Sequence, residues 1–372
     1  MKKVIFLSVI ALAAAVSCSK SEVVDTKFES EAIGFDTYLG RDAQTKATET
    51  TAANLAEFGV YGFYTAAVDY ASGTTANLMN HVQVTKSGND WTYSPARYWT
   101  NDTDKYTFFA YAPYSVGKAG GAPEISYTVP SALADQKDVI YSVNNRNVTK
   151  TSCKQTDGTY VPFEFKHALS RIAVKANAKM YDKATGLEVT GTPSAGQEYD
   201  HTFTIKNISL SGKFCTIGTM DLSVPFTTAQ DGTVSGGPVW TATPSTTDIT
   251  YNLTGAVSQP LTATSYNFSA EVANNYLMVI PTAFSAEKET VTEGETKKEV
   301  YKNAAALTIQ YTVTYAGATS DVITKTVYIT TGFEQGKAYV IDLTLQRNDD
   351  NAIIFNVKGV DGWGDDQTVT VS

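Results

Sequence analysis

Residues 91–113 read Trp-Thr-Tyr-Ser-Pro-Ala-Arg-Tyr-Trp-Thr-Asn-Asp-Thr-Asp-Lys-Tyr-Thr-Phe-Phe-Ala-Tyr-Ala-Pro, and they show how this chain is built. Two aromatic-rich segments, 91–93 and 105–111, lie on either side of the polar cluster 101–104. Aromatic and β-branched residues favour strands, whereas clusters of Asn and Asp mark turns. The second segment also alternates as a partly buried strand would. The stretch therefore predicts two short strands separated by a turn.

Similar segments run along most of the chain. Each is a short run rich in apolar, aromatic or β-branched residues, and Gly, Ser, Asn or Asp separates it from the next. Such runs predict an all-β chain with no helix longer than two turns. Residues 305–315 and 322–331 are expected to pair as a hairpin. The other predicted strands are 32–39, 58–64, 78–85, 125–129, 138–143, 161–165, 170–177, 202–209, 249–253, 275–280, 338–345 and 352–360.

The length of 372 residues suggests two domains, at about 100–200 residues each. Regularly spaced short strands favour β-sandwiches. The polar stretch 144–159 is the best boundary, which gives an N-terminal sandwich at 42–157 and a C-terminal sandwich at 158–372. Within the second, residues 225–248 and the charged stretch 286–302 are interpreted as loops.

The composition argues against several functions. A net charge of −9 does not suit a nucleic-acid partner, which needs a basic face. The histidines His81, His167 and His201 are far apart, and none has a neighbour at metal-ligand spacing. The chain has neither a nucleophile elbow nor a phosphate loop. We therefore expect no catalytic residue, metal or cofactor; an enzyme would need two carboxylates facing each other in a cleft.

The first residues resemble an export signal. Residues 1–17 combine Lys2 and Lys3 with an apolar run that is too short to span a bilayer. Ala-Val-Ser-Cys at 15–18 resembles a bacterial lipobox, so Cys18 is the expected lipidation site, although Ala15 stands where Leu gives the stronger form. The alternative is an ordinary secreted protein. Residues 19–30 are polar and unpatterned, as a tether between lipid and fold would be.

Two further cysteines, Cys153 and Cys215, are far apart in the sequence. An exported protein could pair them, since disulfides persist outside the cytosol. Nothing else in the sequence indicates a disulfide framework, so we favour two unpaired, structural cysteines.

The block 91–113 resembles the fimbrillin family of Bacteroidales surface proteins. It is similar to the signature W-x-Y-x-P-x-R-Y-W followed by F-F-A-Y-A-P in the fimbrillin-like branch of that family. Asp-Val-Ile-Tyr at 138–141 and Phe-Lys-His-Ala-Leu-Ser-Arg-Ile at 165–172 resemble two further family stretches. The resemblance covers nearly the whole mature chain.

This resemblance implies a precursor of two tandem transthyretin-like (Greek-key) β-sandwich domains. It also implies a lipoprotein of the outer membrane that is built into a pilus for adhesion, with other pilin subunits of the same or a related type as partners. In the family an Arg-specific protease removes the N-terminal strand. Arg41 follows the predicted strand directly, so residues 18–41 would form the propeptide; Lys46 is the weaker candidate, and a solvated loop arginine is the alternative.

A sandwich that loses a strand exposes unpaired backbone groups that recruit another strand. The removed strand would carry Ile33 and Phe35 on one face. The C-terminal segment 352–372 could donate the replacement. The candidate donor residues are Ile353, Phe355, Val357, Val369 and Val371. The alternative is that this segment merely closes the last sandwich.

The sequence leaves the role within a pilus open among shaft, tip and anchor, and it does not identify a host or bacterial surface ligand. A different class of function is a surface glycan-binding lipoprotein that does not polymerise. Its sugar platform would use exposed aromatic side chains. The candidates are Trp91, Tyr98, Trp99 and Trp240.

Overall fold

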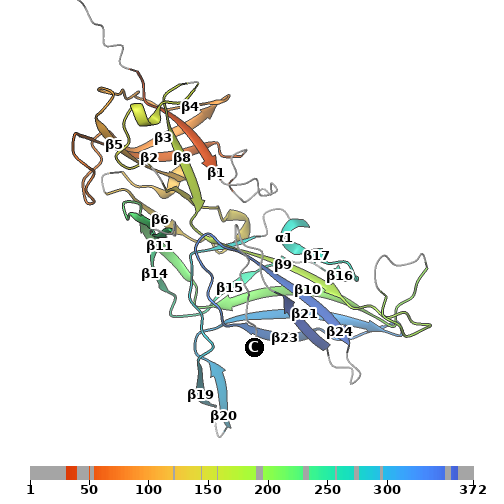
Figure 1. Ribbon diagram of the computed structural model, residues 1–372. Coiled ribbons are helices and arrows are strands. Elements are labelled where there is room, and N and C mark those ends of the chain that lie inside the picture. The colour runs from red at the N-terminus through yellow and green to blue at the C-terminus, as the bar shows by residue number, and fades with distance from the viewer. Residues whose placement is uncertain are drawn as a thin grey trace, which may run out of the picture.

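The computed structural model shows an elongated molecule built from β-strands (Figure 1). The predicted signal peptide and five residues that the sequence singles out, namely Cys18, Arg41, Lys46, Val369 and Val371, lie outside the residues that the structure describes. The described residues are 31–39, 50, 54–119, 122–143, 145–156, 158–189, 196–228, 234–255, 258–271, 276–293, 296–347 and 353–358.

The first sheet has seven strands in the order β1-β8-β7-β5-β2-β3-β4. All neighbouring strands are antiparallel except β1 and β8, which are parallel. The bounds are β1 Gly34–Leu39, β2 Glu57–Ala66, β3 Met79–Ser87, β4 Asp90–Thr92, β5 Lys105–Ala112, β7 Ile140–Ser142 and β8 Tyr160–His167.

Both faces of the central strands β2, β5 and β7 are buried, whereas β8 and β1 each expose one face. Alternate side chains of a strand point to opposite faces, so Phe58 and Phe108 join one core and Tyr61 and Phe109 join another. This explains why 105–111 is apolar at nearly every position.

Two further sheets, arranged as in a β-sandwich, lie below the first sheet in Figure 1. The six-stranded sheet contains β15-β10-β21-β22, with β16 on β10 and β23 on β21; the five-stranded sheet contains β17-β9-β24-β25, with β18 on β9. The antiparallel pair β21–β23 confirms the predicted hairpin. The bounds are β9 Ser170–Ala178, β10 His201–Gly212, β15 Ile249–Asn252, β16 Gln259–Pro260, β17 Tyr266–Asn267, β18 Leu277–Val279, β21 Ala305–Tyr315, β22 Ala318–Thr319, β23 Ile323–Ile329, β24 Ala338–Arg347 and β25 Ile353–Lys358.

A three-stranded sheet joins the two halves of the chain. Its order is β14 (Trp240–Pro244), β11 (Cys215–Asp221) and β6 (Glu124–Thr128), so a strand from the first half pairs with a strand from the second. In addition, β8 starts after the predicted division at 157/158 but pairs with β1 and β7 of the first sheet. Backbone hydrogen bonds therefore cross the predicted boundary.

Helices are short within the described residues. The single α-helix α1 spans Phe268–Glu271, and the 3-10 helices are η1 Tyr114–Val116, η2 Leu133–Asp135 and η3 Thr151–Cys153. The all-β prediction is confirmed. No helix in the described ranges is long and apolar enough to cross a membrane.

Two stretches interpreted above as loops contain strands, so those interpretations were wrong. Residues 225–248 contain β12 (Phe226–Thr228), β13 (Val234–Gly236) and β14, and residues 286–302 form the hairpin of β19 (Lys288–Glu293) and β20 (Thr296–Tyr301). The second hairpin stands out from the body of the molecule (Figure 1). Because both of its faces meet solvent, it lacks the apolar alternation by which a strand is recognised.

The two cysteines of the folded region are unpaired and buried, in agreement with the prediction. Cys153 belongs to the core that contains Phe58, and Cys215 to the core that contains Tyr61. Burial raises the pKa of the Cys153 thiol to about 11, because an apolar environment disfavours the thiolate. The thiol therefore stays protonated at neutral pH.

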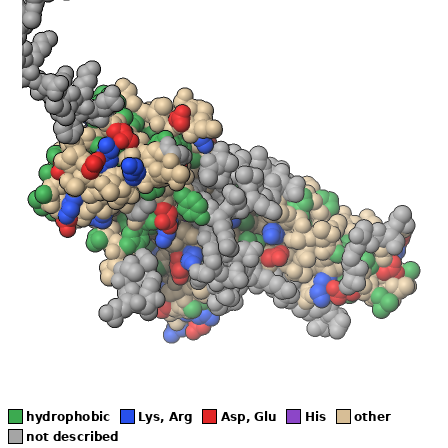
Figure 2. All heavy atoms as spheres, turned by 45° about the horizontal axis from the view of Figure 1, so that its top comes forward, with side chains coloured by type: hydrophobic (Ala, Val, Ile, Leu, Met, Phe, Trp, Pro, Cys, Tyr) green, Lys and Arg blue, Asp and Glu red, His purple; other side chains and the backbone are tan. Residues whose placement is uncertain are grey.

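Acidic and basic side chains are interspersed on the face of the molecule shown in Figure 2. No basic patch of the kind that binds phosphates stands out on that face. This distribution agrees with the net charge of −9.

Candidate functional site

Strand β1 and the residues just before it contact two other segments from the first half of the chain. On one side it pairs in parallel with β8, from Gly34 opposite Tyr160 to Leu39 opposite Phe165. On the other side the residues just before it meet the segment 97–99. There the Ile33 N–H donates to the Arg97 carbonyl at 2.8 Å, and the Trp99 N–H donates to the Glu31 carbonyl at 3.0 Å.

The side chains of this strand alternate as predicted. Ile33 and Phe35 are only 1% and 4% exposed, whereas Tyr38 on the opposite face is 62% exposed. The Leu39 side chain lies outside the described set. The prediction that Ile33 and Phe35 share a buried face is confirmed. Burying two such side chains contributes roughly 3–6 kcal/mol to holding the strand in place.

Phe35 is enclosed by aromatic rings from several segments of the first sheet. Its ring centroid lies 5.3 Å from that of Phe163, 5.4 Å from Tyr93, 5.9 Å from Phe108 and 6.1 Å from Phe58. Offset and edge-on arrangements of this kind are favourable beyond the buried area alone. We call the site that these four rings and the edge of β8 form around β1 the β1 groove.

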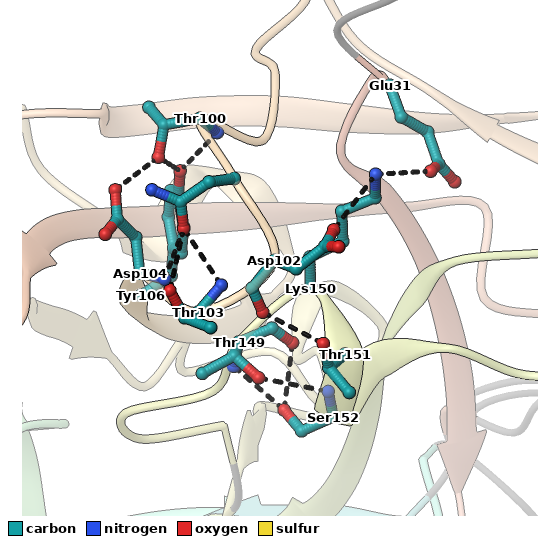
Figure 3. A network of polar contacts seen from close by, with 11 residues as sticks. Glu31, Thr100, Asp102, Thr103, Asp104, Tyr106, Thr149, Lys150, Thr151 and Ser152 are labelled. Atoms are coloured by element: carbon teal, nitrogen blue, oxygen red, sulfur yellow. Dashed lines mark hydrogen bonds and ion pairs between the residues drawn. The ribbon is translucent and has the colours of Figure 1, made fainter. Parts of the chain in front are cut away.

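A polar cluster lies at the end of the groove where the chain enters it (Figure 3). Lys150 is 3.1 Å from a carboxylate oxygen of Glu31 and 3.5 Å from one of Asp102. Hydrogen bonding from the Thr159 side chain, and then from Lys150, lowers the pKa of Glu31. Both partners of the ion pair are partly exposed, so it contributes at most about 1 kcal/mol.

Asp102 belongs to a turn that is closed by side-chain hydrogen bonds. The side-chain oxygen of Asn101 accepts hydrogen bonds from the backbone N–H groups of Thr103 and Asp104, at 2.9 Å and 2.7 Å. The Asp102 carbonyl accepts one from the Thr151 hydroxyl at 3.0 Å, which ties the turn to the segment that carries Lys150 (Figure 3). These hydrogen bonds help to position the Lys150 side chain at the end of the β1 groove where the chain enters it.

The geometry of the groove suits the binding of an extended strand. Without β1, strand β8 would show an unpaired row of N–H and C=O groups beside an apolar trench. Such an edge captures a segment through main-chain hydrogen bonds and through pockets for alternate side chains. The site therefore supports strand addition.

Strand β25, the predicted donor, lies at the edge of the five-stranded sheet. It pairs antiparallel with β24, with Ile353 opposite Arg347, Phe355 opposite Leu345 and Val357 opposite Leu343. Its only neighbour in the described sheet is β24. In this structure it occupies the position of a closing strand, the alternative that the sequence left open.

The three histidines lie apart in the fold. His81 contacts the hydroxyl of Tyr111 and stacks on Tyr114 with centroids 4.1 Å apart, and His167 is 2.7 Å from the Asp138 carboxylate. His201 lies on β10. Within the described ranges no group of three or more His, Cys, Asp or Glu residues is placed to hold a metal ion.

The four aromatic residues considered for a sugar platform differ in their exposure and their contacts. Trp99 is only 3% exposed and lies in the core against Tyr106, whereas Tyr98 is 49% exposed. Trp91 packs edge-on against Phe58, and the Trp240 indole N–H donates to the Ala168 carbonyl at 2.7 Å. Trp91, Trp99 and Trp240 therefore pack within the fold, whereas Tyr98 is exposed.

Sequence reasoning missed several residues of the groove. Tyr93 and Phe163 belong to segments that were predicted as strands, but no periodicity indicates that they meet Phe35. Lys150 lies in the polar stretch that was interpreted as a domain boundary. Only the pairing of β1 with β8 brings these residues together.

Comparison with known proteins identifies the family to which this chain belongs. The fold is an all-β protein with sandwich-like sheets and a strand-binding edge. A family model described as fimbrillin-like matches residues 45–359. The chain therefore belongs to the fimbrillin-like family, whose members are fimbrial structural proteins of a cell-surface appendage rather than enzymes.

One relative and one solved structure illustrate the likeness. Fimbrium subunit Fim1C of Phocaeicola vulgatus is 32% identical over 189 residues, which is 45% of this chain and 49% of that protein. The match thus spans about half the length of this curated relative. A crystal structure of a fimbrial protein from Bacteroides vulgatus shares the fold with a TM-score of 0.51 at 19% identity, covering 89% of this chain and 99% of that one.

Proposed function

We propose that this protein is a pilus subunit that polymerises by donor-strand exchange and serves adhesion. The observation that carries the proposal is β1, which is held at a sheet edge by the buried side chains of Phe35 and of the preceding Ile33 and which ends two residues before Arg41. While β1 fills the groove, no other strand can enter it. Its removal frees the edge for a strand of the next subunit.

Before polymerisation the proposal includes export and lipidation. Residues 1–17 serve as the signal peptide, and Cys18 carries the lipid that holds the precursor on the outer membrane. Several acyl chains, at about 0.8 kcal/mol for each buried CH2, give stable anchoring. Cleavage at Arg41 by an Arg-specific protease then releases the mature chain from its propeptide and its lipid together.

The architecture we propose is a pair of transthyretin-like sandwiches. Because β8 pairs with β1 and β7, we place the junction between them after His167 rather than at residue 157. The β6–β11 pairing would hold the two sandwiches together in a filament under load.

Replacing Arg41 tests the processing step. In Arg41→Ala we expect the mature form to be absent and the precursor to persist at the membrane, because an Arg-specific protease needs the guanidinium. The measurement is the mass of the protein recovered from the cell surface. Lys46→Ala is the matched control and should be processed normally. Normal maturation of Arg41→Ala would show that cleavage occurs elsewhere, and a block in Lys46→Ala would move the site there.

A further inference from the structure

The six-stranded sheet has one buried face and one face that points to solvent. Its strands β10, β21 and β23 lie side by side in Figure 1, and β15 lies on the other side of β10. Phe203 and Ile309 belong to the buried face, since both are enclosed in the core. The alternate residues of each strand point the other way. We call the surface that these outward residues of the four strands form the polar sheet face.

Short, uncharged polar side chains make up most of this face. Its central row is Asn252, Ser209, Thr308 and Thr326, which lie opposite one another on four neighbouring strands. The rows on either side consist of Ser, Thr, Asn, Gln and Ala, with one Tyr at a corner. Asn252 and Thr326 are exposed, and Ser209 and Thr308 are partly exposed. The face therefore meets solvent with groups that form hydrogen bonds but carry no charge.

Charge is scarce on the polar sheet face, although 18% of the chain is charged and its net charge is −9. Among the outward positions of the four strands, all of which the structure describes, Lys206 alone is charged. Lys206 lies at the bulge of β10, where its ammonium group donates to the Ser258 hydroxyl at 2.8 Å. Lys325 pairs with the buried Ile309 and so belongs to the inward phase of β23. Two copies of an acidic chain repel each other least where such faces meet.

The hydroxyl groups of the face can bond to a second face of the same kind. The hydroxyls of Ser211 and Thr250 are 2.9 Å apart, and those of Thr308 and Thr326 are 3.2 Å apart. A hydroxyl donates one hydrogen bond and accepts two, so each pair keeps bonding capacity for a partner. A face of such groups is complementary to itself across a two-fold axis, whereas a charged face would bring like charges together.

We propose that the polar sheet face docks against the same face of a second copy of this chain. β10 pairs with β21 from His201 to Ser211. This length of about 35 Å and a width of up to four strands give roughly 500 Å² for each copy. The total of about 1,000 Å² is the lower limit for a specific interface, so the contact between two single subunits is weak.

A glycan is the other class of partner for a surface of hydroxyl and amide groups. Exposed aromatic rings would provide the stacking platform for a sugar. Among the outward positions of the four strands, Tyr328 is the one aromatic residue. It is 37% exposed and its ring packs against Tyr301, with centroids 4.9 Å apart. Because the centre of the face has hydroxyls and amides in place of rings, the second copy is favoured.

The docking would connect filaments with one another. In a filament of the proposed kind the polar sheet face repeats with every subunit, so weak contacts between two filaments add up. This inference goes beyond the proposed function, because it concerns a different sheet and a contact that forms without strand exchange.

Sedimentation of the Cys18→Ser precursor tests the proposal. This variant lacks the expected lipidation site and keeps β1 in its groove, so neither a lipid nor strand exchange can cause association. We expect a reversible dimer as the protein concentration approaches roughly 1 mM, which suits so small an interface. Thr308→Lys adds a charge at the centre of the face. We expect it to raise the dissociation constant of the dimer at least about tenfold, because like charges then meet.

Thr128→Lys is the matched control, since it adds the same charge at an exposed position of β6, outside the face. It should associate as readily as the Cys18→Ser precursor. Thr326→Lys repeats the test on an edge strand of the face, where a substitution disturbs folding least. Thermal unfolding shows whether each variant is folded.

A precursor that stays monomeric at about 1 mM would overturn the proposal, as would equal association of all three lysine variants. Binding of a neutral polysaccharide that Thr308→Lys abolishes, without self-association, would assign the face to a glycan instead. The precursor cannot exchange strands, so these results are independent of the proposed function, which filament formation by the processed protein tests separately.

Discussion

Replacing Phe35 with Ala in the precursor is expected to lower the free energy of unfolding by about 3–5 kcal/mol. This is the usual loss when a buried Phe side chain is truncated to Ala. The ring is 4% exposed and contacts Phe163, Tyr93 and Phe108, so little can collapse to fill the space. Denaturant unfolding followed by tryptophan fluorescence would measure the loss, since Trp99 lies in the same core.

Tyr38→Ala is the matched control for this variant. Tyr38 lies on the same strand but is 62% exposed, so its loss should change stability by no more than about 0.5 kcal/mol. A similar effect for the two substitutions would mean that β1 is not held by its buried face. Under the proposed cleavage at Arg41, the processed protein lacks residue 35 altogether, so the mature forms of Phe35→Ala and the unsubstituted chain should behave identically.

Deletion of residues 352–372 is expected to abolish filament formation while leaving a folded monomer. The deletion removes β25, but β24 keeps its parallel pairing with β9 from Ala338 to Leu345. The second sandwich therefore retains its core and loses only an edge strand. Electron microscopy of processed protein, together with thermal unfolding, would show no filaments and a cooperative transition.

A shorter deletion, of residues 361–372, separates the two parts of the C-terminal segment. It keeps β25 with Ile353, Phe355 and Val357, and it removes Val369 and Val371. We expect this variant to polymerise, because the proposed donor strand is intact. Filaments from the longer deletion would exclude the C-terminal donor, and failure of the shorter one would assign an essential role to the last residues.

The strands with regular apolar alternation were well predicted from sequence. Ala305–Tyr315 was predicted with the bounds the structure shows, because Leu307, Ile309 and Tyr311 recur on one buried face. The buried face that carries Ile33 and Phe35 was predicted from the same alternation. Strands β19 and β20 were missed because their polar side chains meet solvent on both faces.

The contacts of the groove could not be predicted, because they join segments far apart in the chain. The pairing of β1 with β8 brings residue 35 beside residue 161, and the β6–β11 pairing crosses the expected domain boundary. Local propensity carries no information about such pairings, which tertiary packing decides. Lys150 illustrates the consequence, since only the folded chain brings it to Glu31.

Donor-strand exchange is tested most directly by the intact mass and N-terminal sequence of this protein in filaments taken from the native cell surface. We predict a chain that begins at Asp42 and carries no lipid, so that another strand must fill the β1 groove. Filament subunits that begin at an acylated Cys18 and retain residues 33–39 would contradict this prediction, because their groove would still be occupied by their own strand.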